Sequence, residues 1–455
     1  MAWEDAVASV DHRLAGNEEM TSRIRSATTK DKVILITLGR ESGSDKVIEG
    51  IMGALADTLE SEGVVVNTVR LSDVARVGTG QLCELLENPG TIACISYLGI
   101  GAELPLKFDD RQTPVNIWDW YNIPFIKLHG DSPAYFLDRH RDVPVTGVNL
   151  YGATEFLHIA NTWAPNRYAL SATLTPFVIW DTPKYALNLK SRRNGRLVYL
   201  KNGNSPKALR DLWAARLPPR VAALLSDLAS AILPPALRPS AMPIDQFVEK
   251  HLSELGINPH TAGYLVPMFT AQLDDYLRRE KGTMVARALM DFPVVVQGDR
   301  WDHIDFSNAR ARLTPSEDYN DARRIFTDEL GIIEISPNND TGPHERLWRA
   351  AGTWSLGLTN RQSWLESEFD GLTDISFDYS NDAIQSRVSD VLAHPDRYIE
   401  LGMEFGAQFR KVYSTQRFVE KIRLLAELTQ LRTNPAKPQL QDYFIWPSHG
   451  AILEN

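Results

Sequence analysis

The sequence contains only two cysteines, Cys83 and Cys94, in 455 residues. Two cysteines cannot form a disulfide framework or a cysteine-rich metal cluster, which excludes the small disulfide-stapled domains. No hydrophobic run approaches the roughly 20 residues that cross a bilayer. The acidic N-terminus also lacks the basic-then-apolar order of a signal peptide. These absences predict a cytoplasmic protein without a transmembrane segment.

An excess of positive charge is also missing. The chain has 48 Lys and Arg residues against 58 Asp and Glu residues, which gives a formal net charge of −10. This balance argues against nucleic acid as a partner. Hydrophobic residues make up 43% and charged residues 23% of the chain, as in globular proteins. The length exceeds what one hydrophobic core supports, so we expect two domains.

Several familiar catalytic motifs are absent too. The sequence has no P-loop, no HExxH helix and no G-x-S-x-G elbow. Its acidic groups, Asp109-Asp110, Asp274-Asp275 and Asp302 to Asp305, are isolated, and we interpret them as surface residues or helix caps. We therefore expect neither a bound metal nor a cofactor.

The most informative stretch is 331–358, GIIEISPNNDTGPHERLWRAAGTWSLGL. A short apolar run, 332–335, predicts a buried strand. A turn-rich loop follows, and Pro343 predicts the first position of a helix, because its missing N–H would have no partner there. Gly352 is expected to end that helix. A second apolar segment, 354–358, continues the chain.

A strand, a polar loop and a helix N-terminus together form a candidate anion site. Free backbone N–H groups and the positive end of the helix dipole point out of such a loop. His344 and Arg346 could add donors, and Glu345 could pair with sugar hydroxyls. The alternative is an ordinary strand–turn–helix in which Glu345 only complements the dipole and Arg346 is only solvated.

Three motifs in this half carry a resemblance: SPNNDTGPHERLWRAAG at 336–352, FDY at 377–379 and HPDR at 394–397. They resemble the C-terminal half of CgeB-like, family-1-like bacterial glycosyltransferases, most clearly over 293–418. The resemblance implies an α/β fold of the GT-B class, in which two Rossmann-like domains face each other across a cleft. It also implies transfer of a sugar from a nucleotide-diphosphate donor.

The chain departs from this pattern at one position. Many relatives of this fold carry a glutamate just before the small residues and their glycine, where this chain has Arg349. Glu345 lies one helical turn earlier. It is the carboxylate that remains for the donor's ribose.

The first half of the chain alternates strands with helices, which predicts a parallel sheet. Strands are predicted at 32–38, 64–71, 91–97 and 124–128, with helices at 46–61 and 81–87. The strand 124–128 leads directly to His129 and Asp131.

At the end of a parallel strand, His129 and Asp131 are candidates for the base that takes the acceptor's proton. Histidine suits this role because its unperturbed pKa lies near neutrality. The sequence does not choose between the two. In the alternative interpretation, Asp131 caps the next turn and His129 is a core residue.

The second half begins with a predicted strand at 196–200, and its loop contains Asn202 and Gly203, which would face the donor's phosphates in a GT-B fold. A long helical stretch, 208–289, is interrupted by prolines. The strand 293–296 leads to Gly298 and Trp301. Trp301 is a candidate for stacking on a nucleobase, with core packing as the alternative.

These elements predict four regions: a helical lead-in at 1–30, an acceptor domain at 31–190, a donor domain at 191–412 and a returning helix and tail at 413–455. The helical stretch 208–289 would be an insertion in the donor domain. The basic cluster 190–196 is expected to be a solvated linker between the domains.

We therefore predict a metal-independent glycosyltransferase with a UDP-, GDP- or dTDP-type donor and a protein, polysaccharide or lipid-linked acceptor. The alternatives are a non-catalytic binding or scaffold protein and a sugar-nucleotide epimerase. The oligomeric state is left open. The predicted donor-binding residues are Asn202, Gly203, Gly298, Trp301, Ser336, Asn338, Thr341, Gly342, His344, Glu345 and Arg346.

Overall fold

The computed structural model describes most of the chain, in the ranges 31–39, 44–107, 113–141, 144–165, 169–238, 241–261, 263–336 and 338–433. The predicted lead-in 1–30 and the acidic pair Asp109-Asp110 therefore lie outside the described residues. Pro337 and the tail beyond 433 lie outside them as well.

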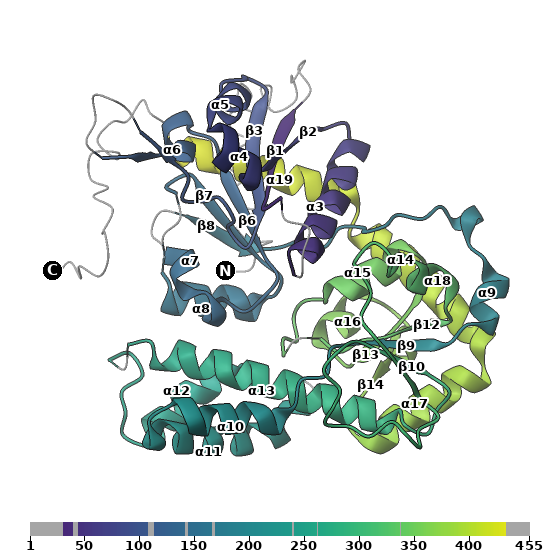
Figure 1. The fold of residues 1–455 in the computed structure, drawn as a ribbon. Coiled ribbons are helices and arrows are strands. Elements are labelled where there is room, and N and C mark those ends of the chain that lie inside the picture. Colours follow the sequence, from purple (N-terminus) through teal and green to yellow (C-terminus); the bar gives the residue numbers. More distant parts are fainter. Residues whose placement is uncertain are drawn as a thin grey trace.

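The first lobe is built on a sheet of six parallel strands in the order β2-β1-β3-β6-β7-β8 (Figure 1). Its central strands are almost wholly buried, because helices cover both faces of a parallel sheet. The strands are β1 (Lys32–Thr37), β2 (Val65–Arg70), β3 (Thr91–Tyr97), β6 (Phe125–His129), β7 (Gly147–Tyr151) and β8 (Leu170–Thr173).

The connections of this sheet carry the helices of the first lobe. A short antiparallel pair, β4 (Pro105–Leu106) with β5 (Val115–Asn116), lies outside the sheet. The helices are α3 (Ser44–Ser61), α4 (Leu71–Val77), α5 (Gly80–Leu86), α6 (Ile117–Tyr121), η1 (Pro133–Tyr135), α7 (Leu137–Arg141) and α8 (Thr154–Trp163). Beyond β8, η2 (Lys184–Ala186) and α9 (Leu189–Asn194) lead to the second lobe.

The second lobe repeats this architecture, with six parallel strands in the order β11-β10-β9-β12-β13-β14. Its strands are shorter than those of the first lobe. They are β9 (Leu197–Leu200), β10 (Val295–Gln297), β11 (Arg312–Thr314), β12 (Gly331–Ile333), β13 (Leu356–Asn360) and β14 (Ser376–Phe377).

Helices of the second lobe connect these strands and follow them in the chain. They are α14 (Arg323–Asp328), α15 (Glu345–Gly352), α16 (Ser363–Glu368), η3 (Thr373–Ile375), α17 (Asn381–Ala393) and α18 (Pro395–Val412).

A helical bundle is inserted between β9 and β10 (Figure 1). Prolines start two of its helices. The sequence suggested that prolines interrupt this stretch, but Pro234 and Pro235 lie inside the last turn of α11 and do not interrupt it. The bundle consists of α10 (Pro206–Arg216), α11 (Pro219–Ala236), α12 (Ile244–Glu254) and α13 (Leu265–Ala288). Helix α13 packs against η1 of the first lobe and α17 of the second, so it joins the two lobes.

The last helix, α19 (Thr415–Arg432), returns to the first lobe and packs on α3, β3 and β7 (yellow in Figure 1). Buried Lys421 donates to the carbonyl of Thr173 at 2.6 Å, and Arg423 pairs with Asp31 at 2.6 Å. The first lobe therefore contains segments from both ends of the described chain.

Two lobes of this kind form the GT-B architecture, which confirms the predicted fold class. The strong apolar strands were predicted within one or two residues, and β3 was predicted with its observed bounds. The sequence analysis missed β8 and β11, which are edge strands with half-buried or exposed side chains.

The basic cluster at 190–196 differs from the prediction of a solvated linker. Arg192 is 1% exposed, and its guanidinium donates to the carbonyls of Thr327, Trp354, Phe326 and Thr353 at 2.5–3.2 Å. It satisfies the backbone carbonyls at the ends of two second-lobe helices, where no intrahelical donor is available.

Candidate active site

Both sheets place their carboxyl ends at the boundary between the lobes. In the second sheet the chain order reverses between β9 and β12, and ligands of open parallel sheets bind at such a switch point. Most of the predicted donor-binding residues lie in the loops that follow β9, β10 and β12. The remaining two, Glu345 and Arg346, lie in the first turn of α15.

The loops after β9 and β10 interlock closely. A Cβ on Gly298 would lie 2.1 Å from the carbonyl oxygen of Lys201, and one on Gly203 would lie 2.1 Å from the ring of Trp301. Only glycine fits at either position. Asn202 Oδ1 accepts from the backbone N–H of Asp299 at 2.9 Å, which fixes the second loop on the first.

The buried side chain of Trp301 packs against the loop after β9. It is 2% exposed, packs on Gly203 and donates from Nε1 to the carbonyl of Lys201 at 3.0 Å. The structure thus brings together Asn202, Gly203, Gly298 and Trp301, as predicted, but leaves little of the indole surface for a nucleobase.

A cavity of about 440 Å³ opens beside these loops. One wall comes from the loop after β9, another from α13, and a third from α15. Four cationic side chains line it, and two of them come from the inserted helix. The cavity is lined by Tyr135, Lys201, Asn202, Gly203, Asn204, Asp275, Arg278, Arg279, Gly282, Thr283, Trp301 and Arg346.

Two of the four cations have a carboxylate within 3 Å. Arg278 pairs with Asp274 at 2.7 Å, and Arg279 pairs with Asp275 at 2.7 Å, each one helical turn away. Asp274 is 2% exposed and also accepts from the Tyr135 hydroxyl at 2.6 Å. The sequence interpretation of Asp274-Asp275 as surface or capping residues is therefore wrong for Asp274, whereas the Asp275 side chain is 32% exposed.

The other two cations have no close counter-charge. Arg346 lies 3.9 Å from Glu334 and 4.0 Å from Glu345, and its Nη1 is buried without a hydrogen-bond partner among the described residues. The Lys201 ammonium makes no hydrogen bond or ion pair within the described part of the chain, although its backbone N–H donates to Gln297 and its carbonyl accepts from Trp301. Burial together with Arg346 and Arg278 lowers the pKa of Lys201 to about 7. The cavity therefore has an excess of positive charge that is suited to an anion.

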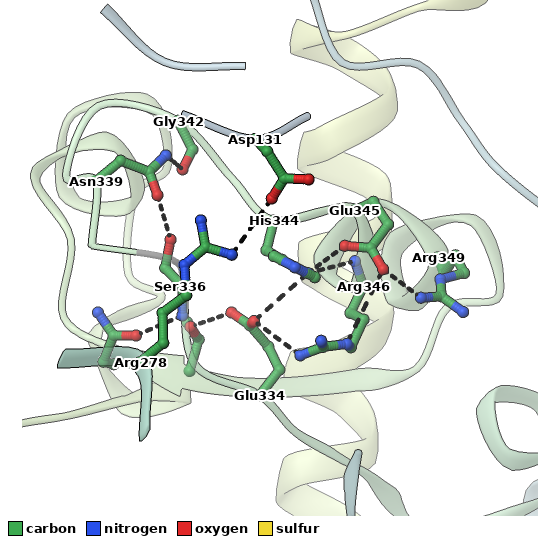
Figure 2. A network of polar contacts seen from close by, with 12 residues as sticks. Asp131, Arg278, Glu334, Ser336, Asn339, Gly342, His344, Glu345, Arg346 and Arg349 are labelled. Carbon is green, nitrogen blue, oxygen red and sulfur yellow. Dashed lines mark hydrogen bonds and ion pairs between the residues drawn. The ribbon is translucent and has the colours of Figure 1, made fainter. Parts of the chain in front are cut away.

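Glu334 lies one residue beyond β12 and 3.9 Å from Arg346, which lines the cavity. It is 0% exposed, and its Oε1 accepts from the Thr359 hydroxyl at 2.5 Å. Its Oε2 has no hydrogen-bond partner in the described chain and faces Arg346 and His344, each at 3.9 Å (Figure 2). Burial raises the pKa of Glu334 to about 7, although Arg346 and Thr359 oppose the shift.

Helix α15 begins at Glu345, two residues later than the predicted first position, Pro343. His344 precedes the first helical turn, and its Nδ1 lies 3.3 Å from the backbone N of Arg346. When neutral, this nitrogen accepts the N–H and caps the helix. Burial lowers the pKa of His344 to about 4. The predicted free helix N-terminus is therefore capped by the chain itself.

Glu345 is also engaged. Its carboxylate pairs with Arg349 at 2.5 Å and contacts His344. Arg349 is 6% exposed, and its guanidinium lies about 5 Å from the rings of Trp180 and Tyr319. Although burial raises the pKa of Glu345, its interactions with His344, Arg349 and Arg346 outweigh burial and hold that pKa well below the usual value.

The polar side chains of the loop after β12 form hydrogen bonds within the loop and to helix α13. Ser336 donates to Asn339 Oδ1 at 3.1 Å, and Asn339 donates to the carbonyl of Gly342 at 3.1 Å (Figure 2). Asn338 donates to Asp274 on α13 at 3.0 Å and accepts from Lys281 Nζ at 2.9 Å. These bonds fasten the loop to the inserted helix.

The amide groups of this loop, which the sequence assigned to an anionic ligand, instead face a carboxylate of the first lobe. Glu155 on α8 accepts from the backbone N–H groups of Asp340 at 2.7 Å and Thr341 at 3.2 Å, and from the Thr341 hydroxyl. A Cβ on Gly342 would lie 1.9 Å from the carbonyl oxygen of Gly152. This Glu155 latch holds the two lobes together at the loop.

The structure separates the two candidates for the base. His129 is 2% exposed, its Nε2 lies 3.0 Å from Asn149 Oδ1, and its ring packs on His140 and Tyr151. Burial, followed by His140, lowers its pKa well below the ordinary value. The Asp131 side chain is 40% exposed and lies 3.3 Å from Arg278 (Figure 2). Neither residue lines the cavity, but Asp131 contacts Arg278, which does.

Sequence reasoning did not identify Glu155, Arg278 and Lys201 as parts of this site. The pattern DDYLRREK at 274–281 carries two aspartate–arginine pairs at four-residue spacing, which was a readable signal for an ordered charged helix face. Glu155 had no such signal, because its partner Asp340 is 185 residues away in the chain.

Within the described ranges, no group of three or more His, Cys, Asp or Glu side chains is arranged to hold a metal ion. No helix in the same ranges is both long and apolar enough to cross a membrane.

Comparison with protein-family models and with curated proteins finds no match. Among solved structures, the chain is similar to sucrose-phosphate synthase from Thermosynechococcus elongatus, with 8% identity, a TM-score of 0.42, and 91% of this chain and 100% of that chain covered. An α-glucosyltransferase solved with UDP and a DNA 13-mer has 9% identity, a TM-score of 0.46, and 88% and 100% coverage. Anabaena HepE with UDP-glucose has 10% identity, a TM-score of 0.38, and 86% and 98% coverage.

Proposed function

We propose that this protein is a glycosyltransferase that moves a sugar from a nucleotide-diphosphate donor to an acceptor hydroxyl. The observation that carries the proposal is the cationic cavity at the switch point of the second sheet, which faces the first lobe. Such a cavity suits a diphosphate, because two of its cations have no carboxylate closer than 3.9 Å among the residues that the structure describes.

In this proposal the donor's diphosphate binds against Arg346, Lys201 and Arg278. When the bond between the anomeric carbon and the phosphate oxygen breaks, the electron pair stays on the diphosphate. The cations stabilise the charge that develops there, which is the role of fixed charges in an excluded site. We propose that they do so without a metal ion. Glu345, held in place by Arg349, is the proposed partner of the ribose hydroxyls.

Asp131 is the proposed base. Its carboxylate would take the proton of the acceptor hydroxyl as that oxygen forms a bond to the anomeric carbon. Arg278 contacts both Asp131 and Asp274, so it places this carboxylate at the edge of the cavity. His129 would support the strand from within the first lobe.

The Glu155 latch holds the lobes in contact at the loop after β12, on the same boundary as the cavity. Closure of the lobes would exclude water, which competes with the acceptor for the donor sugar. We expect the donor to enter before the latch closes. The cytoplasm is the proposed site of the reaction.

Mass spectrometry of the protein with UDP-, GDP- and dTDP-sugars, with and without native cell extract, tests the proposal. We expect one donor class to be consumed, with free nucleoside diphosphate and a glycosylated product. An isomerised sugar nucleotide without free nucleotide would indicate an epimerase instead. Binding without turnover would indicate a non-catalytic binding protein, and no binding would contradict the donor site.

A further inference from the structure

The cavity wall contains an unusual combination of groups. Glu334 Oε2 and Arg346 Nη1 are both buried, both lack a hydrogen-bond partner in the described chain, and lie 3.9 Å apart. That distance is too long for a hydrogen bond. Lys201, one residue beyond the neighbouring strand β9, lines the same cavity. Buried polar groups are normally satisfied, so Glu334 Oε2 and Arg346 Nη1 are arranged for something that arrives from outside.

We propose, as an extension of the donor site above, that the cavity takes up a proton when the donor's diphosphate binds, and that Glu334 is the positioning residue that controls this uptake. Beneath Arg346, a neutral Glu334 leaves the guanidinium available to the diphosphate. An ionised Glu334 competes with the diphosphate for the same guanidinium and for Lys201.

The electrostatic reasoning follows from the surroundings. Burial places the pKa of Glu334 and of Lys201 near 7, one raised and the other lowered from the ordinary value. A bound diphosphate adds negative charge beside both groups, which raises both pKa values and favours the protonated forms. Proton uptake on binding means that the affinity falls as pH rises through about 7.

Other charged and titratable groups also act on this pair. Arg346, Glu345 and His344 approach Glu334 from α15, and Arg278 and Asp274 act on Lys201 from α13. The remaining neighbours are Tyr199 on β9 and Tyr379 beyond β14, whose pKa values are raised by burial. Glu334 and Lys201 are coupled to each other, so the titration belongs to the pair and not to either residue alone.

Isothermal calorimetry in two buffers of different ionisation enthalpy measures the number of protons taken up. The first probe is UDP-glucose, and GDP-mannose and dTDP-glucose follow if it does not bind. In a sugar nucleotide each phosphorus carries one ester bond and the shared anhydride bond, so the ligand lacks the second phosphate ionisation near pH 6 that free nucleotides have. At pH 7 the wild type should take up about 0.5 to 1 proton per ligand.

Two substitutions assign the uptake. In Glu334→Gln the uptake at pH 7 should fall by about half or more, and its maximum should move below pH 7, because Lys201 loses a counter-charge. In Lys201→Arg the charge persists without a pKa near 7, so the uptake should also fall. Asp318→Asn removes an exposed pair with Lys46, neither of which lines the cavity, and should leave the uptake unchanged.

The result that overturns the inference is sugar-nucleotide binding by the wild type without proton uptake between pH 6 and 8. Uptake that is the same in the wild type, Glu334→Gln and Lys201→Arg would also overturn it. The wild-type measurement needs no variant to fold. Failure of all three sugar nucleotides to bind would instead refute the proposed function, so the two failures can be told apart.

Discussion

Two polar regions lie side by side at the carboxyl edge of the second sheet, and they are built in opposite ways. The loop at 336–343 is rich in hydrogen-bonding groups, but its side chains and amides are engaged by one another, by Asp274 and by Glu155. The neighbouring cavity is also lined by polar side chains, yet two of its cations, Lys201 and Arg346, have no carboxylate closer than 3.9 Å among the described residues. The comparison teaches that unsatisfied charge, and not the density of polar groups, marks the candidate ligand site.

The difference has a structural cause. Backbone amides of a loop at a lobe boundary must find acceptors when the lobes close, and Glu155 provides them. The cations of the cavity project from three separate elements into a space of about 440 Å³, where no single carboxylate reaches them all. The loop is therefore suited to closing the lobes and the cavity to binding an anion.

The largest expected effect lies at the rim of the cavity. Asp131→Asn removes the proposed base while keeping the size of the side chain, so turnover should fall about 10²- to 10⁴-fold with donor affinity changed little. Steady-state kinetics with the active donor measures this. The matched control is His129→Gln, which should lower thermal stability more than turnover. Equal losses of turnover in the two variants would contradict the assignment.

The next effect sharpens the contrast between cavity and loop. Arg346→Ala removes a charged donor to the diphosphate and should weaken sugar-nucleotide binding about 10- to 100-fold. Calorimetry at pH 6.5 measures the affinity. Thr341→Val, in the loop, should bind the sugar nucleotide within about threefold of wild type. If the loop variant loses affinity and Arg346→Ala does not, the assignment of the two regions is reversed.

The smallest effect concerns the latch. Glu155→Ala leaves the amides of Asp340 and Thr341 without their carboxylate, so the lobes should separate more often. Small-angle scattering should show a larger radius of gyration, and donor affinity should fall a few-fold. Asp318→Asn breaks an exposed contact between the lobes that contributes about 0 to 1 kcal/mol and should change neither quantity. An unchanged radius in Glu155→Ala would show that the latch does not hold the lobes.

Much of the fold could be predicted from the sequence because buried parallel strands give unambiguous apolar runs. Examples are β1 and β3, in which burial on both faces leaves no polar alternation. Strands β8 and β11 lie at sheet edges, where exposure removes that signal. Arg192 was misjudged for a related reason, since a basic run gives no indication that one of its members is buried among carbonyl groups.

The position of a candidate residue could be predicted only where the residue closely follows a strand. Gly203, Gly298 and Trp301 lie in two interlocking loops, because each follows a strand of the same sheet. The contributions of Arg278 and Glu155 depend on how an inserted helix and the first lobe pack against the loops. No local pattern specifies that packing.

The most direct test of the central claim is a crystal structure of the protein with an intact sugar nucleotide. We predict that oxygens of both phosphates accept hydrogen bonds from Arg346 and Lys201, with Glu155 still bound to the amides of Asp340 and Thr341. A diphosphate on those amides, with Glu155 displaced and the cavity free of ligand, would contradict the account.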